Sequence, residues 1–314
     1  MISRKFTIWA CGLLFVFGSC AEDMVKPIEN DKDAPGTVQD VKTESLPGAV
    51  KFTYTLPSDP DLLYVLAKYT NKTGKVMEFR SSFYTNSVTV EGFGDTDTYK
   101  VELYTVDRSE NRSQPQIVEV VPLTPPILSC YESLSMVSDF GGMTFEMDNK
   151  FKSDLAIYVC TPDELGDMVL AETFYSAREE IVYSVRGYDA VPRRFGIFLQ
   201  DKYGNETDTL FTELTPIYER ELDKTKFREM YLQNDSRVDS YDGKMEYVWN
   251  GRISKDGDSG GVGLHTGTGT KDGPAVFTFD LGVLAKLSRF ALWAIQDEKH
   301  FYNDMNPRRY EVWG

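Results

Sequence analysis

The sequence predicts an all-β chain of tandem β-sandwiches followed by part of a third sandwich. Three observations support this fold class. The chain of 314 residues is rich in turn-forming and aromatic residues, with 24 Gly, 14 Pro, 18 Tyr and 19 Phe. Apolar and polar residues alternate in short runs that turn residues separate, as in half-buried strands. One pattern of residues also recurs 94 positions later in the chain.

Residues 1–19 have the pattern of a lipoprotein signal peptide. Arg4 and Lys5 precede an apolar stretch, residues 8–17, that is too short to span a bilayer and is followed by small residues. The next residue, Cys20, resembles the cysteine of a bacterial lipobox, which is acylated and becomes the first residue of the mature chain. Ordinary signal cleavage near the same point is the alternative. Residues 20–36 are polar and predict a tether between this lipid anchor and the first domain.

The charge of the chain excludes one class of partner. There are 49 acidic and 34 basic residues, which give a net charge of −15. Removal of the signal peptide with its two basic residues leaves 32 against 49, or −17. Such a chain has no basic surface to neutralise phosphates, so nucleic-acid binding is not expected.

Residues 37–124 are expected to form the first sandwich. Val50, Phe52 and Tyr54 alternate with polar residues, which is the period of a half-buried strand. Further short strands are expected at residues 62–69, 76–83, 88–90 and 99–106, with turn residues between them. Short strands at this even spacing are typical of a β-sandwich.

Residues 125–217 are expected to form a second copy of the same domain, because the two segments match at a constant offset of 94. Prolines between residues 122 and 126 mark the boundary, since proline removes a donor from the strand ladder. Asp107 and Asp201 are expected to cap their turns through their side chains, and no catalytic role is assigned to them. The matched residues are Leu63, Tyr64 and Val65 with Ile157, Tyr158 and Val159; Val101 and Leu103 with Phe195 and Ile197; Asp107 and Asn111 with Asp201 and Asn205; and Pro122 with Pro216.

The matched segments carry a family resemblance. Residues 99–107 (YKVELYTVD) with residues 109–113 (SENRS) resemble the F strand and F–G turn of a fibronectin type III domain. Residues 195–205 (FGIFLQDKYGN) resemble a divergent copy. The tryptophan usual in strand B is replaced by Phe52 and Phe145 in its neighbourhood. The resemblance implies two fibronectin type III/immunoglobulin-like sandwiches.

Two cysteines remain in the second domain once the signal peptide is removed and Cys20 is acylated. Cys130 and Cys160 could form a disulfide in an exported protein. The alternative is two buried thiols on different strands.

Residues 218–236 are charged and predict a linker or a short helix, and residues 237–314 differ in pattern from both repeats. The phrases Phe277-Thr-Phe-Asp-Leu-Gly282, Leu287-Ser-Arg-Phe290 and Arg309-Tyr-Glu-Val-Trp-Gly314 together resemble a discoidin domain (factor V/VIII type C, galactose-binding-like). Such a domain is longer than this segment. We therefore expect a partial jelly-roll sandwich whose Phe279, Phe290, Leu292 and Tyr310 lack part of their cover.

The order of these parts resembles surface lipoproteins of the Bacteroidota with domains of unknown function. The resemblance implies a non-catalytic protein on the outer membrane, facing the cell exterior. It also implies binding of polysaccharide or oligosaccharide beside SusC/SusD-type outer-membrane proteins. A structural or adhesive spacer that binds a partner protein is the alternative. A hydrolase is a third reading, because a glycosidase needs only two carboxyl groups and this chain has many.

A glycan site needs aromatic faces and hydrogen-bonding groups, and the third region has both. We select Trp249, Asp297, His300, Phe301 and Tyr302 as glycan-binding residues, because the last three lie in a loop between predicted strands. The alternative is that Trp249 belongs to the core and that the loop aromatics pack locally.

Cofactor and modification sites have weaker support. Asn250, Asp256 and Asp258 offer hard oxygen ligands for a structural calcium ion, but a solvated turn explains the same residues. No other metal or cofactor and no catalytic motif is expected. Asp208-Thr-Leu210 matches a short O-glycosylation motif of the Bacteroidota, which makes Thr209 a candidate acceptor.

Overall fold

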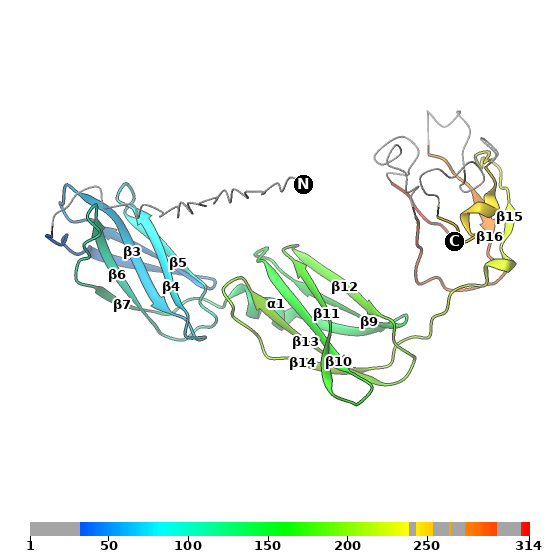
Figure 1. Cartoon of the computed structure of the whole chain (residues 1–314), viewed down its shortest axis with the longest axis horizontal. Coiled ribbons are helices and arrows are strands. Elements are labelled where there is room, and N and C mark those ends of the chain that lie inside the picture. Colours follow the sequence, from blue (N-terminus) through cyan, green and yellow to red (C-terminus); the bar gives the residue numbers. More distant parts are fainter. Residues whose placement is uncertain (1–31, 239–242, 254–263, 265–273, 294–308) are drawn as a thin grey trace, which may run out of the picture.

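The computed structural model describes residues 32–238, 243–253, 264, 274–293 and 309–314. These residues form two β-sandwich domains and a smaller third region (Figure 1). The predicted all-β fold of tandem β-sandwiches is therefore confirmed. The predicted signal peptide and Cys20 lie outside the described residues. Within the described ranges, no helix is long and apolar enough to cross a membrane.

Domain 1 is a sandwich of two antiparallel sheets. One sheet has the strand order β1-β2-β5, and the other has the order β4-β3-β6-β7. The strands are β1 (Gln39–Leu46), β2 (Ala49–Thr55), β3 (Leu62–Thr70), β4 (Val76–Ser82), β5 (Ser87–Glu91), β6 (Tyr99–Asp107) and β7 (Gln116–Val120).

The core of domain 1 follows from the alternation along its strands. In β2, Val50, Phe52 and Tyr54 are buried, whereas the intervening Lys51 and Thr53 are exposed. This confirms the predicted half-buried strand. Burial of a side chain as large as that of Phe52 contributes about 2 to 3 kcal/mol.

Domain 2 repeats this architecture, with sheets of order β8-β9-β12 and β11-β10-β13-β14. The matching strand orders confirm the internal repeat. The strands are β8 (Ser135–Asp139), β9 (Gly142–Asp148), β10 (Leu155–Pro162), β11 (Met168–Ser176), β12 (Glu180–Arg186), β13 (Arg193–Asp201) and β14 (Leu210–Leu214).

A short helix that the sequence pattern did not predict, α1 (Pro126–Ser133), opens domain 2. Pro126 occupies the first helical turn, where the missing N–H of proline costs nothing. Ile127 and Cys130 lie three residues apart, so both face the core and are buried. The helix thus closes one end of the sandwich with two side chains.

The repeat is not uniform along the chain. Phe198 of β13 lies 94 residues after Tyr104 of β6, but their partners on the neighbouring strand are Tyr158 and Leu66, which are 92 residues apart. The predicted constant offset is therefore wrong for β3 and β10. It is also wrong for β1/β8 and β2/β9, where the pair Leu46–Ala49 corresponds to Asp139–Gly142 at an offset of 93. An irregularity in the β3–β6 pairing between Leu62 and Tyr64 accounts for one of the two residues by which β3/β10 and β6/β13 differ, because the offset is 93 at Leu62 and 92 from Tyr64 on. A shift of two residues leaves every side chain on its predicted face.

The predicted turn caps are confirmed in both domains. Asp107 accepts hydrogen bonds from the backbone N of Asn111 (2.8 Å) and from its Nδ2 (2.9 Å). Asp201 accepts the same two bonds from Asn205, at 2.9 and 2.8 Å. Each aspartate thus closes the turn between the last two strands of its sheet.

Domain 2 contacts domain 1 through this second turn. Nδ2 of Asn205 also donates to the carbonyl oxygen of Gly92, at 3.2 Å. Gly92 has a φ of +86° and lies against the ring of Tyr203, where an added Cβ would come within 2.8 Å of the ring. Only glycine combines this backbone conformation with so close an approach. The turn that Asp201 closes is therefore also an interdomain contact.

The third region holds two short strands and two 3₁₀ turns in its described parts. These elements are η1 (Lys224–Lys226), β15 (Arg228–Met230), η3 (Met245–Val248) and β16 (Thr278–Asp280), and β15 pairs with β16. In the segment predicted as a linker, Glu219 accepts a hydrogen bond from Ser288 Oγ (2.8 Å) and lies 3.4 Å from Nη1 of Arg186. Glu219 thus joins residues of domain 2 and the third region.

Candidate functional site

The structure describes one of the five predicted glycan-binding residues. Trp249 follows η3 and lies between two rings, with centroid distances of 5.7 Å to Phe227 and 5.2 Å to Phe279. These contacts correspond to the alternative in which Trp249 packs in a local core. Asp297, His300, Phe301 and Tyr302 lie outside the described residues, so their grouping stays a prediction.

The other predicted third-region sites are described only in part. The side chain of Asn250 accepts a hydrogen bond from the backbone N of Arg252 at 2.8 Å, as in an Asx turn. Asp256 and Asp258 lie outside the described residues. Calcium binding by this turn therefore stays a prediction.

Cys130 and Cys160 are free thiols in the structure, which corresponds to the alternative of two thiols rather than to the possible disulfide. Cys130 lies on α1 rather than on a strand, and its Sγ is 3.6 Å from Oδ1 of Asn149 in the core. Cys160 lies on β10 among residues that alternate between buried and half-buried positions, and it takes a half-buried one. The thiols therefore belong to different layers. Burial raises the pKa of Cys130 to about 11, which makes this thiol unreactive at neutral pH.

Thr209 lies in the segment that leads into β14 and is partly buried. Its Cγ2 methyl lies against Gly196, at 3.0 Å from where a Cβ of that residue would be. Modification of Thr209 stays a prediction.

The four-stranded sheet of domain 2 carries an aromatic surface that the sequence pattern did not single out. Each strand places one aromatic side chain on the face opposite the core: Tyr175 on β11, Tyr158 on β10, Phe198 on β13 and Phe211 on β14. We call these four residues the aromatic strip. Its arrangement follows from the register, because Tyr175 pairs with Ala156, Tyr158 with Phe198, and Phe211 with Gly196.

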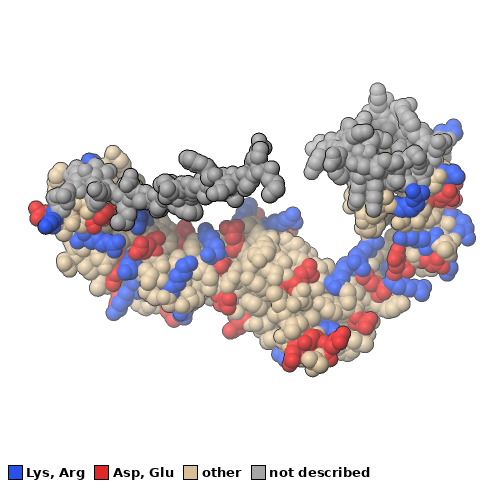
Figure 2. Space-filling view, viewed as in Figure 1, with Lys and Arg blue, Asp and Glu red and all other residues tan. Residues whose placement is uncertain are grey.

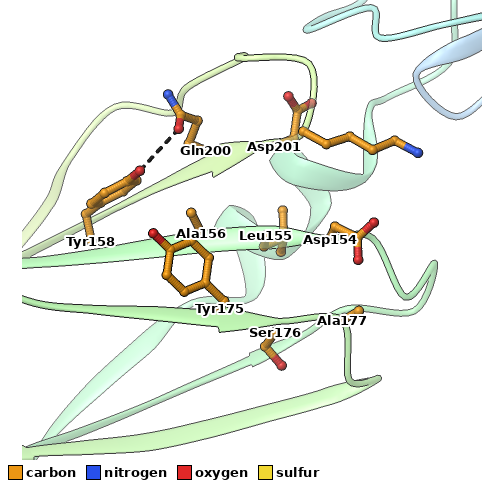
Figure 3. A pocket seen from close by; sticks show the side chains of 10 residues that line it. Asp154, Leu155, Ala156, Tyr158, Tyr175, Ser176, Ala177, Gln200 and Asp201 are labelled. Atoms are coloured by element: carbon orange, nitrogen blue, oxygen red, sulfur yellow. Dashed lines mark hydrogen bonds between the residues drawn. The ribbon is translucent and has the colours of Figure 1, made fainter.

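At one end of the strip the surface is hollowed into an open groove of about 660 Å³. Figure 3 shows Tyr158, Tyr175 and Gln200 around the small side chain of Ala156, which leaves the hollow between them. The ring of Tyr158 stacks on Phe198, with centroids 4.7 Å apart and planes 11° from parallel. Its hydroxyl donates a hydrogen bond to Oε1 of Gln200 at 3.2 Å. Tyr175 is 75% exposed, so its ring is open to a ligand.

The polar groups of the groove are of several kinds. Asp154, Ser176, Gln200 and Lys202 supply a carboxylate, a hydroxyl, an amide and an ammonium group. The amide of Gln200 also accepts from Tyr158 and donates to Glu206 (2.7 Å), which fixes its orientation. Asp201 also lines the groove, but its carboxylate already accepts two hydrogen bonds from Asn205. Flat ring faces beside mixed donors and acceptors suit a ligand with one apolar and one hydroxyl-bearing side.

The equivalent face of domain 1 has a different chemistry. Its four-stranded sheet presents the charged residues Lys68, Glu78, Arg80, Glu102, Lys100 and Glu119. Ion pairs join Arg80 to Glu78 (3.8 Å) and Lys100 to Glu119 (3.6 Å). In Figure 2, charged side chains of both signs are interspersed over the sandwiches, and uncharged surface covers much of domain 2. Tyr64 and Tyr104 also lie on this face, where their hydroxyls donate hydrogen bonds to Glu110 and Glu102. Of the two described four-stranded sheets, only that of the second repeat has an outward-facing aromatic residue on every strand.

One signal in the sequence could have pointed to this surface. Outward-facing positions of β3 and β10, and of β6 and β13, can be compared once the repeat is known. Such a comparison sets Glu102 of the first repeat against Gly196 of the second, at the offset of 94. A change from charged to small or aromatic residues on an exposed face is typical of a binding surface.

Three family models match successive parts of the chain. Residues 35–122 match a domain of unknown function (DUF4959), and residues 123–225 match a second one (DUF5126). Residues 249–314 match a third, DUF5000, which is also described as a domain of unknown function. Each match covers less than half of the chain.

Several solved structures are similar to parts of the chain, whereas no curated protein sequence matches it. The SusE-like protein BT2857 is 29% identical, with a TM-score of 0.33, over 52% of this chain and 57% of its own. This chain therefore spans little more than half the length of that protein. A segment of two fibronectin type III domains from chicken tenascin is 12% identical, with a TM-score of 0.28, over 57% of this chain and 99% of its own. The fn3 domain of the human collagen alpha-1(XX) chain is 14% identical, with a TM-score of 0.26, over 31% of this chain and 92% of its own.

Proposed function

We propose that this protein is a non-catalytic, lipid-anchored glycan-binding protein on the bacterial cell surface. The observation that carries the proposal is the groove at the end of the aromatic strip. Tyr175 and Tyr158 offer ring faces for the apolar side of a sugar, and Gln200, Asp154 and Lys202 offer partners for its hydroxyl groups. The combination of an aromatic face with a few convergent polar groups is the general form of a small-ligand site.

The proposed cellular location of this binding comes from the sequence of the N-terminal segment. Acylation at Cys20 anchors the chain to the outer membrane, and the polar tether holds the sandwiches away from the lipid. In this proposal the protein works in a polysaccharide-utilisation system with SusC/SusD-type partners. The third region, a discoidin-like domain, supplies a second glycan contact through Asp297, His300, Phe301 and Tyr302, with Asn250, Asp256 and Asp258 holding a calcium ion.

Binding is tested with purified residues 21–314 and a panel of starch, xylan, β-mannan, arabinan and pectin in affinity electrophoresis. We expect retention by at least one polysaccharide without release of reducing ends. Tyr175→Ala is expected to weaken binding roughly tenfold, which corresponds to about 1.4 kcal/mol. The matched control is Tyr84→Ala, because Tyr84 is also strongly exposed but lies on domain 1.

Three outcomes separate the proposal from its alternatives. Retention of no polysaccharide, together with capture of a surface protein, would support the spacer. Turnover of a polysaccharide that one carboxylate-to-amide change abolishes would show a hydrolase. If changes in the third region abolish retention and Tyr175→Ala does not affect it, the glycan site lies in the third region and not in domain 2.

A further inference from the structure

We infer that the aromatic strip binds an extended oligosaccharide chain, across all four strands of the sheet, rather than a single sugar at the groove. The inference rests on the proposed function and specifies the ligand of the same site. Its basis is that the four aromatic residues form a continuous diagonal and that hydrogen-bonding groups lie at both ends of it.

The diagonal follows from the strand register. Tyr175 lies opposite Ala156, and Phe211 lies opposite Gly196, which itself pairs with Cys160 four residues farther along β10. Strands lie about 4.8 Å apart and residues rise about 3.3 Å each, so the strip runs roughly 20 Å from Tyr175 to Phe211. This length accommodates several sugar rings in a row, whereas the groove occupies only its first part.

Small residues keep the path between the aromatic side chains open. Ala156, Cys160 and Gly196 share the outward face with the strip. The ring of Phe211 lies directly over Gly196, because a Cβ there would come within 2.7 Å of the ring. Gly196 therefore lets the Phe211 ring lie against the sheet, two residues along β13 from Phe198.

The far end of the strip also carries a hydrogen-bonding group. The guanidinium carbon of Arg194 lies 4.0 Å from the centroid of the Phe211 ring, and Arg194 is itself exposed. The guanidinium group therefore lies over one face of this ring, and its N–H groups can donate to sugar hydroxyls that reach this end of the strip. The groove end has Gln200 and Lys202 in the same role. An oligosaccharide has apolar ring faces and hydroxyl groups along its whole length. It can therefore contact the aromatic side chains and, at both ends of the strip, the polar groups.

Domain 1 supplies a matched reference for the inference. The position equivalent to Phe211 is Ile117, since Phe211 pairs with Gly196 and Ile117 pairs with Glu102, 94 residues before Gly196. The position equivalent to Tyr158 is Leu66, which is fully buried. Of the four positions in domain 1 that are equivalent to the strip, only one is aromatic; they are Ser82, Leu66, Tyr104 and Ile117. Domain 1 therefore has no continuous strip across its described sheet, and a change at Ile117 controls for a change at Phe211.

The test measures affinity against chain length by titration calorimetry, with malto-, xylo-, manno- and arabino-oligosaccharides of two to eight units. We expect the affinity to rise roughly tenfold from the shortest to the longest member of the series that binds. Phe211→Ala and, independently, Arg194→Ala are expected to lower the affinity for the longest member roughly fivefold and to leave the shortest unchanged. Tyr175→Ala is expected to weaken both, and Ile117→Ala neither.

Each result decides between the inference and the proposed function. Equal affinity for short and long members, or equal effects of Phe211→Ala on both, overturns the inference while binding at the groove stands. Failure of every polysaccharide and oligosaccharide to bind overturns the proposed function and the inference with it. Arg194 lies at the surface, so Arg194→Ala keeps the test decisive if Phe211→Ala does not fold.

Discussion

The hydroxyl of Tyr203 in domain 2 donates a hydrogen bond to the carboxylate of Glu91 in domain 1. The ring of Tyr203 covers Gly92, and Asn205 donates to the carbonyl oxygen of that glycine. The end of β5 is thus held by side chains from the turn between β13 and β14. The same turn continues into the groove through Asp201 and Lys202, so the interdomain contact and the candidate site share one structural element.

Tyr203→Phe removes this hydrogen bond and keeps the ring. We expect it to lower the free energy of unfolding by about 1.5 kcal/mol, the low end for a bond to a charged group, because both side chains are partly exposed. Calorimetry on the purified protein measures the effect, with Tyr84→Phe as the control at an exposed tyrosine. In a double-mutant cycle with Glu91→Gln the two losses should not add, and additive losses would show that the pair is not coupled.

Gly92→Ala is expected to destabilise the protein by more than 2 kcal/mol, or about twice the strain of a positive φ alone. The excess comes from the contact of the new Cβ with the Tyr203 ring. Gly74→Ala is the matched control, because Gly74 has a φ of +80° and open space around its Cβ position. Urea unfolding of both variants measures the difference. An equal loss of unfolding free energy in Gly92→Ala and Gly74→Ala would mean that the Tyr203 ring moves away from the new Cβ without destabilising the protein.

Alkaline pH is expected to weaken the contact between the domains. Burial and, next, the hydrogen bond to Glu91 raise the pKa of Tyr203 above its ordinary value. Because the pKa is higher in the folded than in the unfolded state, the stabilisation is complete below about pH 10 and is lost as the pH rises beyond it. Thermal unfolding from pH 8 to pH 11 should show this loss, and Tyr203→Phe should reduce it. A pH dependence that the substitution leaves unchanged would contradict this assignment.

We expect both thiols to be in the reduced form in purified residues 21–314 to which no reductant has been added. We expect two free thiols by mass spectrometry after alkylation in denaturant. Under native conditions Cys160 should react before Cys130, because burial raises the pKa of Cys130 to about 11 and shields its sulfur. Addition of a reductant should leave the melting temperature unchanged. A fall of the melting temperature on reduction would instead support the disulfide.

Much of the fold could be predicted because it depends on local alternation. The period-two pattern in β2, the repeat, and the caps by Asp107 and Asp201 are each properties of one strand or one turn. Helix α1 escaped prediction because only Ile127 and Cys130 mark its buried face. The different offsets of β3/β10 and β6/β13 depend on the register of long-range strand pairing, which the residues of one strand do not encode.

The candidate site was harder to predict because an outward-facing aromatic residue resembles any other strand residue. Tyr158 is part of the repeat match, yet the sequence alone does not show that Tyr175, Phe198 and Phe211 lie beside it. Their adjacency depends on which strands pair and in which register. The predicted third-region residues were chosen by residue type and loop position, and Trp249 illustrates the limit of that choice, since it packs against Phe227 and Phe279.

The offset between the two repeats changes along the chain, which bears on how such repeats diverge in evolution. It is 93 residues at β1/β8 and β2/β9, 92 at β3/β10 and 94 at β6/β13. A net length change of two residues moved β10 along its neighbour while its core residues stayed inside. Insertion of a single residue into β10 would instead turn Tyr158 into the core and Ile157 toward solvent. Insertions and deletions that keep the regular pairing of these strands should therefore come in even numbers. A single extra residue has to be accommodated by a β-bulge, as between Leu62 and Tyr64, or by a turn.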